Sequence, residues 1–110
     1  MITALKFWNE PNNVSHWDSN LDPEWKDFGQ MVSLATERVR ELAPELTLVL
    51  GGISPIDPTF ITLLGRQGAL DCLDAVAVHG FPLDWNHWQI DEWPRKIEEI
   101  RAVTQLPVWV

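Results

Sequence analysis

The chain has 110 residues, a length typical of one domain, and its 45% apolar and 22% charged residues are close to the globular average, so neither disorder nor a fibrous class is indicated. Sixteen acidic against eight basic residues give a formal net charge of -8, which repels phosphate backbones and anionic membrane surfaces and argues against nucleic acid and membrane partners. The single cysteine, Cys72, and three scattered histidines exclude an internal disulfide and a finger-like zinc site.

The chain opens with TALKFW, residues 3–8, a run rich in apolar side chains that predicts a strand. A helix is predicted next, because its apolar residues recur at alternating spacings of three and four and share one helix face. Those residues are Trp25, Phe28, Val32, Ala35, Val39 and Leu42. Asp22 is placed to cap this helix, Pro23 fits its first position, and Pro44 limits its other end.

The same order of strand and helix follows in the middle of the chain. LTLVLGG, residues 46–52, predicts a second strand. A short second helix is predicted with Asp57 as its cap, Pro58 in its first position and Gly65 or Gly68 at its end.

The last part of the chain repeats this order. DAVAVHGF, residues 74–81, predicts a third strand, and LPVWV, residues 106–110, predicts a fourth. Between them a helix begins near Trp93, with Pro94 in its first turn, and ends before Pro107. Because most of these strands are almost continuously apolar, a parallel sheet buried on both faces is expected. The predicted fold is α/β, one domain spanning residues 1–110, with four parallel strands alternating with three helices.

Polar and aromatic residues gather where the predicted strands end, which is where α/β sheets place their binding groups. Carboxylate and amide groups together with flat indole faces suit a sugar, whose hydroxyls and apolar ring side they would bind. After the first strand these residues are Asn9, Glu10, Asn12, Asn13, His16 and Trp17, after the second Gly51, Gly52 and Ser54, and after the third His79, Phe81, Asp84, Trp85, Asn86, His87 and Trp88.

Each of these residues also has a structural interpretation. Trp17, Trp85 and Trp88 are candidates for stacking on a sugar ring and equally for packing, whereas Trp8, Trp25, Trp93 and Trp109 are interpreted as packing residues. His79 is either a site residue or a structural histidine at the end of a buried strand, and His16 and His87 are interpreted as surface residues.

Glu10 alone would be interpreted as a turn or capping carboxylate. Counting back along the strand from Glu10, Trp8 is expected on the same side and Asn9 on the other, with Pro11 ending the ladder. The carboxylate is therefore expected at the mouth of the strand, on a fixed backbone.

WNEPN, residues 8–12, at the end of a strand resembles the acid/base motif of the retaining glycoside hydrolases with (β/α)8 barrels, most closely family 39, the β-xylosidases and α-L-iduronidases. The resemblance implies that Glu10 is the general acid/base, that Asn9 binds the 2-hydroxyl of the sugar, and that His79 faces the substrate from the sixth strand. It places the chain on strands four to seven of the barrel and requires no metal or organic cofactor.

The resemblance also implies a nucleophilic Glu soon after a strand such as PVWV, and no residue of this chain is assigned that role. A full barrel needs about 250 residues, so the chain is interpreted as half of one, a fragment that carries the acid/base but is inactive alone. Two alternatives stay open, a carbohydrate-binding module without hydrolysis and a structural half barrel that pairs with another chain. Self-association of the chain through open sheet edges is expected, while the sugar, its anomer and the localisation are left open.

Overall fold

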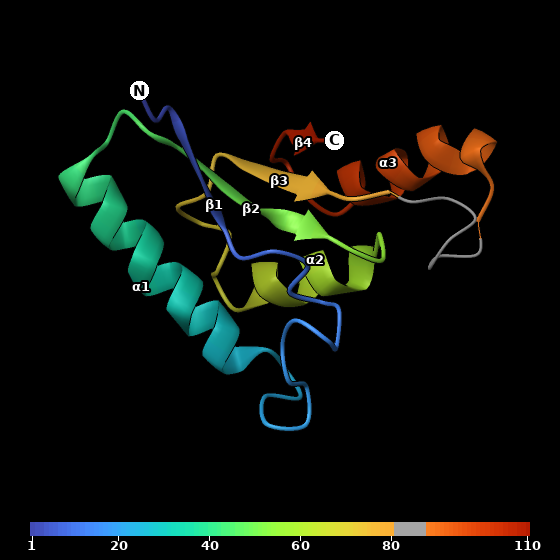
Figure 1. Ribbon diagram of the computed structural model, residues 1–110, viewed down its shortest axis with the longest axis horizontal. Coiled ribbons are helices and arrows are strands. Elements are labelled where there is room, and N and C mark those ends of the chain that lie inside the picture. Colours follow the sequence, from blue (N-terminus) through green and yellow to red (C-terminus); the bar gives the residue numbers. More distant parts are fainter. Residues whose placement is uncertain (81–87) are drawn as a thin grey trace.

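The computed structural model describes residues 1–80 and 88–110, and its strands lie side by side in one parallel sheet (Figure 1). The strands, in their order across the sheet, are β1 (Ala4–Phe7), β2 (Thr47–Ile53), β3 (Ala75–Val78) and β4 (Val108–Trp109). The helices between them are α1 (Lys26–Leu42), α2 (Pro58–Arg66) and α3 (Trp93–Arg101), with a 3-10 turn, η1 (Ile90–Glu92), before α3. The predicted α/β class, with four parallel strands and three helices, is confirmed.

The two faces of the sheet carry different side chains because successive residues of a strand point to opposite sides. On the helix-side face, Leu48 and Leu50 of β2 and Val76 of β3 are fully buried in the core. Figure 1 shows α1 and α2 along this side of the sheet. The apolar faces of the three helices complete the core with Phe28, Val32, Phe60, Ile61, Leu64 and Ile100. The second face of the sheet includes Lys6, Val49, Gly51, Ala75, Ala77 and Trp109, none of which belongs to the core cluster.

The pairing of β2 with β3 is irregular at the end of the sheet that carries the site. Leu50 pairs with Val76 and Ile53 pairs with Val78, so two residues of β2 lie opposite the single residue Ala77 of β3. This extra residue is an irregularity of the β-bulge kind, and it lets both Leu50 and Ile53 reach the core. The residues between them, Gly51 and Gly52, are therefore left on the second face together.

The start of α1 differs from the prediction. The helix begins at Lys26 and not at Pro23, because Trp25, just before it, has a left-handed backbone with φ 49°. Asp22 nevertheless caps the helix from further away, since its carboxylate accepts the backbone N–H groups of Asp27 at 3.2 Å and Phe28 at 3.0 Å. The predicted contact of Asp22 with the first turn is therefore present, whereas the predicted boundary, with Pro23 in the first position, was wrong.

The other two helices begin as predicted. The Asp57 side chain accepts the backbone N–H of Thr59 at 2.8 Å, and Pro58 occupies the first turn of α2. Pro94 lies in the first turn of α3, where its missing N–H removes no helical hydrogen bond. An aspartate cap with a proline in α2, and a first-turn proline in α3, therefore mark the two helix starts.

One arginine ties together the amino ends of the strands, opposite the candidate site. The Arg40 guanidinium donates to the carbonyl oxygens of Leu46 and Cys72 and to the Asp74 carboxylate at 2.8 Å. Asp74 also accepts the backbone N–H of Leu48, and these two partners, the guanidinium first, lower the pKa of Asp74. At this end of the sheet, polar groups of the strands and of α1 are therefore paired with one another.

Candidate functional site

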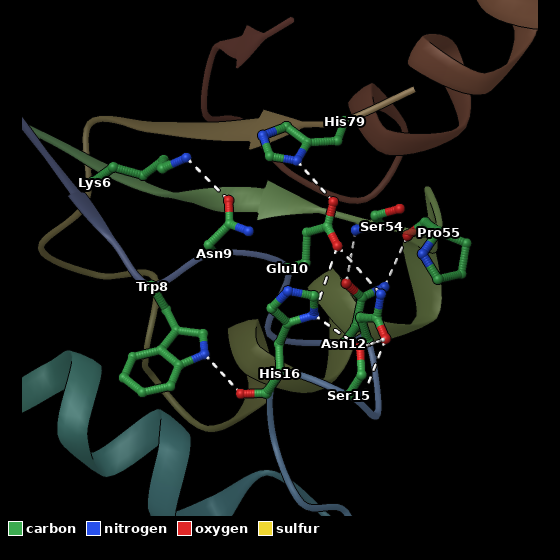
Figure 2. A network of polar contacts seen from close by, with 11 residues as sticks. Lys6, Trp8, Asn9, Glu10, Asn12, Ser15, His16, Ser54, Pro55 and His79 are labelled. Atoms are coloured by element: carbon green, nitrogen blue, oxygen red, sulfur yellow. Dashed lines mark hydrogen bonds and ion pairs between the residues drawn. The ribbon is translucent and has the colours of Figure 1, made fainter. Parts of the chain in front are cut away.

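The backbone that carries Glu10 is not a continuation of β1. The strand ends at Phe7, and Trp8 and Glu10 have left-handed backbones with φ 66° and 49°. Left-handed conformation costs a non-glycine residue about 1 to 3 kcal/mol and is often found at functional sites. The expected strand alternation up to the motif is therefore wrong, and Figure 2 shows Asn9 and Glu10 pointing the same way while Trp8 points elsewhere.

Contacts with the end of β2 and the loop after it hold this unusual backbone in place. The N–H of Glu10 donates to the carbonyl of Gly52 at 3.1 Å. The Asn12 side chain accepts the N–H of Ser54 at 2.9 Å and donates to the carbonyl of Pro55 at 2.8 Å (Figure 2). Pro11 between them is buried, and its carbonyl accepts the indole N–H of Trp25 at 2.8 Å. The carboxylate is thus on a fixed backbone, as expected, although the cause is the loop and not the strand.

The Glu10 carboxylate meets polar side chains from two parts of the chain (Figure 2). Its Oε1 lies 3.0 Å from Nδ1 of His79, which follows β3. Its Oε2 accepts a hydrogen bond from the Asn13 amide at 3.2 Å and lies 3.7 Å from Nδ1 of His16. Because an ionised carboxylate can only accept, Nδ1 of His79 donates when Glu10 is charged. The Glu10 side chain is 15% exposed, so it is held and oriented but still reached by solvent.

Asn9 lies beside Glu10 and is oriented by Lys6. Nζ of Lys6 donates to Oδ1 of Asn9 at 3.3 Å, an exposed contact. Since an ammonium group offers only donors, the contact occupies the amide oxygen of Asn9 and leaves its NH₂ group for another partner. Asn9 and Glu10 therefore supply a hydrogen-bond donor next to a carboxyl group.

The tryptophans predicted to stack on a sugar are placed differently. Trp17 packs edge-on between Trp8 and Phe28, at ring distances of 5.4 and 5.1 Å, and its indole N–H donates to Asp22 at 3.1 Å. Trp88 is 5% exposed and packs edge-on against Trp93. Both side chains serve the core in this structure, a placement that does not favour stacking. Trp85 lies outside the described residues.

The tryptophans interpreted as packing residues divide into two pairs. Trp25 and Trp93 lie partly buried against the core, as expected. Trp8 and Trp109 are 44% and 46% exposed, and Trp109 stands on the second face of the sheet. Short strands explain the difference, because β1 ends before Trp8 and β4 has no further strand beside it among the described residues.

Asp22 accepts several hydrogen bonds at the end of the loop. The N–H groups of Phe28 and Asp27 and the indole of Trp17 donate to its carboxylate. Burial by itself raises the pKa of Asp22, but these hydrogen bonds outweigh it and hold the pKa below the ordinary 3.8. A charged carboxylate therefore joins the loop to the start of α1.

Several residues of the site were named only as part of a polar loop or not named for the site at all. Lys6 contacts Asn9, Asn13 contacts Glu10, and Asn12 anchors the loop. His16, interpreted as a surface residue, is 41% exposed and lies beside Glu10 all the same. The density of amides after the motif was the available signal, whereas nothing in the sequence singled out Lys6. His87, Asp84 and Asn86 lie outside the described residues.

Comparisons of the chain with protein-family models, with curated proteins and with solved structures find no match. In the described ranges, no three or more His, Cys, Asp and Glu side chains are grouped to hold a metal ion. The helices of residues 1–80 and 88–110 include none long and apolar enough to cross a membrane.

Proposed function

We propose that this chain carries the acid/base side of a retaining glycoside hydrolase site, with Glu10 as the general acid and base. The observation that supports this most is the 3.0 Å contact between Glu10 and His79, which joins residues 69 positions apart beyond the ends of β1 and β3. Ligand sites in parallel α/β sheets lie at these carboxyl ends. The WNEPN motif of residues 8–12 agrees with the same role.

In the proposed reaction, Glu10 gives its proton to the leaving glycosidic oxygen and later takes a proton from the attacking water. Contacts from His79 and Asn13 hold the two carboxyl oxygens in a fixed orientation. The NH₂ group of Asn9 donates to a hydroxyl of the bound sugar. A second carboxylate, about 5 to 5.5 Å from the first, is the nucleophile in this mechanism, and we assign that role to no residue of this chain.

The scaffold we propose is part of a (β/α)8 barrel. Its support is the parallel order of β1 to β4 and the packing of all three helices into one core. The second face, with Gly51, Ala75 and Ala77, would be the barrel interior. The substrate class is carbohydrate, and the proposed chemistry uses no metal or organic cofactor.

Sugar binding tests the site directly. Saturation-transfer NMR with 4-nitrophenyl β-D-xylopyranoside and its β-D-glucopyranoside counterpart should show transfer from the chain to the sugar ring protons, weakened at least several-fold in Asn9→Ala and Glu10→Gln. Asn20→Ala and Glu45→Gln are matched controls, because both residues are exposed and outside the site. Transfer that is absent with both probes, or equal in all variants, would sink the proposed site.

Turnover tests whether this chain supplies a nucleophile. We expect no hydrolysis of either aryl glycoside by the 110-residue chain, because acid/base assistance alone completes neither step of retention. Release of nitrophenol with retained configuration by this chain, and its loss in Glu10→Gln, would show that the nucleophile lies within it.

A second candidate is a structural half barrel that pairs with another copy or another chain. It is favoured by the strand order, which leaves β1 and β4 at the two edges of the described sheet, and by the exposed Trp109 on the second face. Unpaired edges invite strand addition. Size-exclusion chromatography with light scattering should show self-association, and a clean monomer over a wide concentration range would count against pairing of identical chains.

A further inference from the structure

The two consecutive glycines of β2 stand at the pairing irregularity, next to the site. Because two residues of β2 lie opposite one residue of β3 there, Gly51 and Gly52 both turn toward the second face, where Lys6 and His79 also lie. A glycine inside a strand often marks a bulge or the close approach of another group. The question is what each glycine makes room for.

Gly52 makes room for the His79 imidazole. A Cβ atom on Gly52 would lie 2.9 Å from Cγ of His79 and closer still to Cδ2 and Nε2. The edge of the ring with Cδ2 and Nε2 therefore lies against the glycine, and Nδ1 is turned toward Oε1 of Glu10. Any side chain on residue 52 would push the ring away from this position.

Gly52 also contacts Glu10 through its own backbone. Its carbonyl accepts the N–H of Glu10 at 3.1 Å, the bond that helps to hold Glu10 in its left-handed conformation. The same residue thus touches the main chain of Glu10 directly and reaches the side chain of Glu10 through His79.

We propose that Gly52 is a positioning residue for the Glu10 carboxylate, which it orients by seating the His79 imidazole against its bare Cα. This inference rests on the proposed function where it treats Glu10 as the reacting group. The geometry it concerns, the pairing of His79 with Glu10, can be measured in the protein without any sugar.

Gly51 supplies a matched control on the same strand. A Cβ atom on Gly51 would lie 3.0 Å from Cβ of Ala77 and 3.3 Å from Cδ of Lys6. These neighbours need to move by only a few tenths of an ångström, and neither touches Glu10. Gly51→Ala and Gly52→Ala add the same methyl group at adjacent positions, so an effect on the site that is specific to Gly52 separates seating of His79 from general strand disturbance.

The experiment combines each glycine variant with Glu10→Gln in a double-mutant cycle. The measured quantity is the NMR chemical shift of the two imidazole nitrogens of His79 in 15N-labelled protein. At alkaline pH imidazoles are neutral, and a ring that donates to Glu10 holds its proton on Nδ1. In the parent chain and in Gly51→Ala, we expect this tautomer and a clear change of the shifts on Glu10→Gln. In Gly52→Ala, we expect His79 shifts that differ from those of the parent and no response to Glu10→Gln.

Two results would overturn the inference. One is a Gly52→Ala chain whose His79 shifts, and their response to Glu10→Gln, equal those of the parent. If Gly52→Ala does not fold, the double variant Gly52→Ala/His79→Ala decides, because removal of the ring should restore folding. A double variant that is still unfolded shows that the methyl group meets something other than His79.

Failure of the function and failure of the inference are distinguishable. If the parent chain binds no sugar probe but the cycle behaves as expected, the glycosidase proposal fails and the seating role of Gly52 stands. If sugar binding depends on Glu10 but Gly52→Ala leaves both binding and the His79 shifts unchanged, the site stands and the role of Gly52 is lost.

Discussion

The two faces of the sheet are built from the same strands and differ in what they do. On the helix-side face, Leu48, Leu50 and Val76 are fully buried among the apolar sides of three helices. On the second face the strands carry Gly51, Ala75 and Ala77, with the long polar side chains Lys6 and His79 lying over the glycines. Large apolar residues bury surface and stabilise the fold, while small ones leave space above the backbone.

This difference shows that residues of the core and residues near the candidate site lie on opposite faces of the sheet because successive residues of a strand alternate, even where they are neighbours in the sequence. Leu50 and Gly51 are neighbours in the chain, yet one lies in the core and the other under Lys6. A substitution on one face should therefore change stability, and one on the other face should change the site. The following experiments test how complete the separation is.

The largest effect is expected for Leu50→Ala. Removal of a fully buried leucine side chain leaves a cavity in the core and should lower the free energy of unfolding by about 2 to 5 kcal/mol. Lys6→Ala, on the second face, removes an exposed side chain and should change it by no more than about 0.5 kcal/mol. Urea unfolding followed by tryptophan fluorescence measures both changes. Equal losses of unfolding free energy in the two variants would contradict the assignment of stability to the helix-side face.

Asp22→Ala should have the next largest effect. The N–H of Phe28 would lose its partner in a buried position, and Asp27 and Trp17 would lose theirs, which predicts a loss of about 1 to 3 kcal/mol. Asp18→Ala, an exposed carboxylate in the same loop, is the control. Hydrogen exchange at the first turn of α1 should rise in Asp22→Ala alone, and unchanged exchange there would show that the cap contributes little.

The pH dependence of stability should reveal the same carboxylate. The folded-state pKa of Asp22 lies below the ordinary 3.8, so its contribution is complete above that pH and is lost as the pH falls through the folded-state value. The urea midpoint should therefore fall steeply below about pH 3.8 and less steeply in Asp22→Asn. Equal acid slopes in the two proteins would mean that Asp22 has the same pKa in the folded and unfolded chains. Asp74, whose pKa is also lowered, contributes to both proteins equally.

Glu10→Gln should have a smaller effect on stability than Leu50→Ala or Asp22→Ala. It alters hydrogen bonds of a partly exposed group, each worth about 0.5 to 1.5 kcal/mol, and leaves the core untouched. Sugar binding should fall while the urea midpoint stays near that of the parent chain. A loss as large as that of Leu50→Ala would show that the carboxylate is part of the structural framework.

The fold could be predicted from the sequence because its signals are local. Each helix signal depends on residues that are close together in the chain. These signals are the apolar spacing of α1, the Asp57–Pro58 start of α2 and Pro94 in the first turn of α3. The strand spans were predicted one to three residues too long at several ends, since a strand ends where its partner ends. Thr3 and Trp8, for example, lie just outside β1.

The site was predicted less completely because its geometry depends on contacts between distant segments. The motif placed Glu10 and Asn9 near a strand end, and the resemblance implied only that His79 faces the substrate. The left-handed backbone of Glu10 depends on Gly52 and on Asn12 with its partners after β2, and no local pattern encodes those contacts. The burial of Trp88 depends on Trp93 and the core in the same way.

The Gly51–Gly52 irregularity makes this strand sensitive to changes in length. Deletion of either glycine would leave β2 in simple alternation opposite β3, with Ile53 still facing the core but with only one glycine on the second face. The carbonyl that receives the N–H of Glu10 belongs to the second of these glycines, and it would be lost or shifted. Surface loops of this chain can gain or lose residues at low cost, but the loss of one residue at this position would remove the space under the His79 ring while the core pairing is kept.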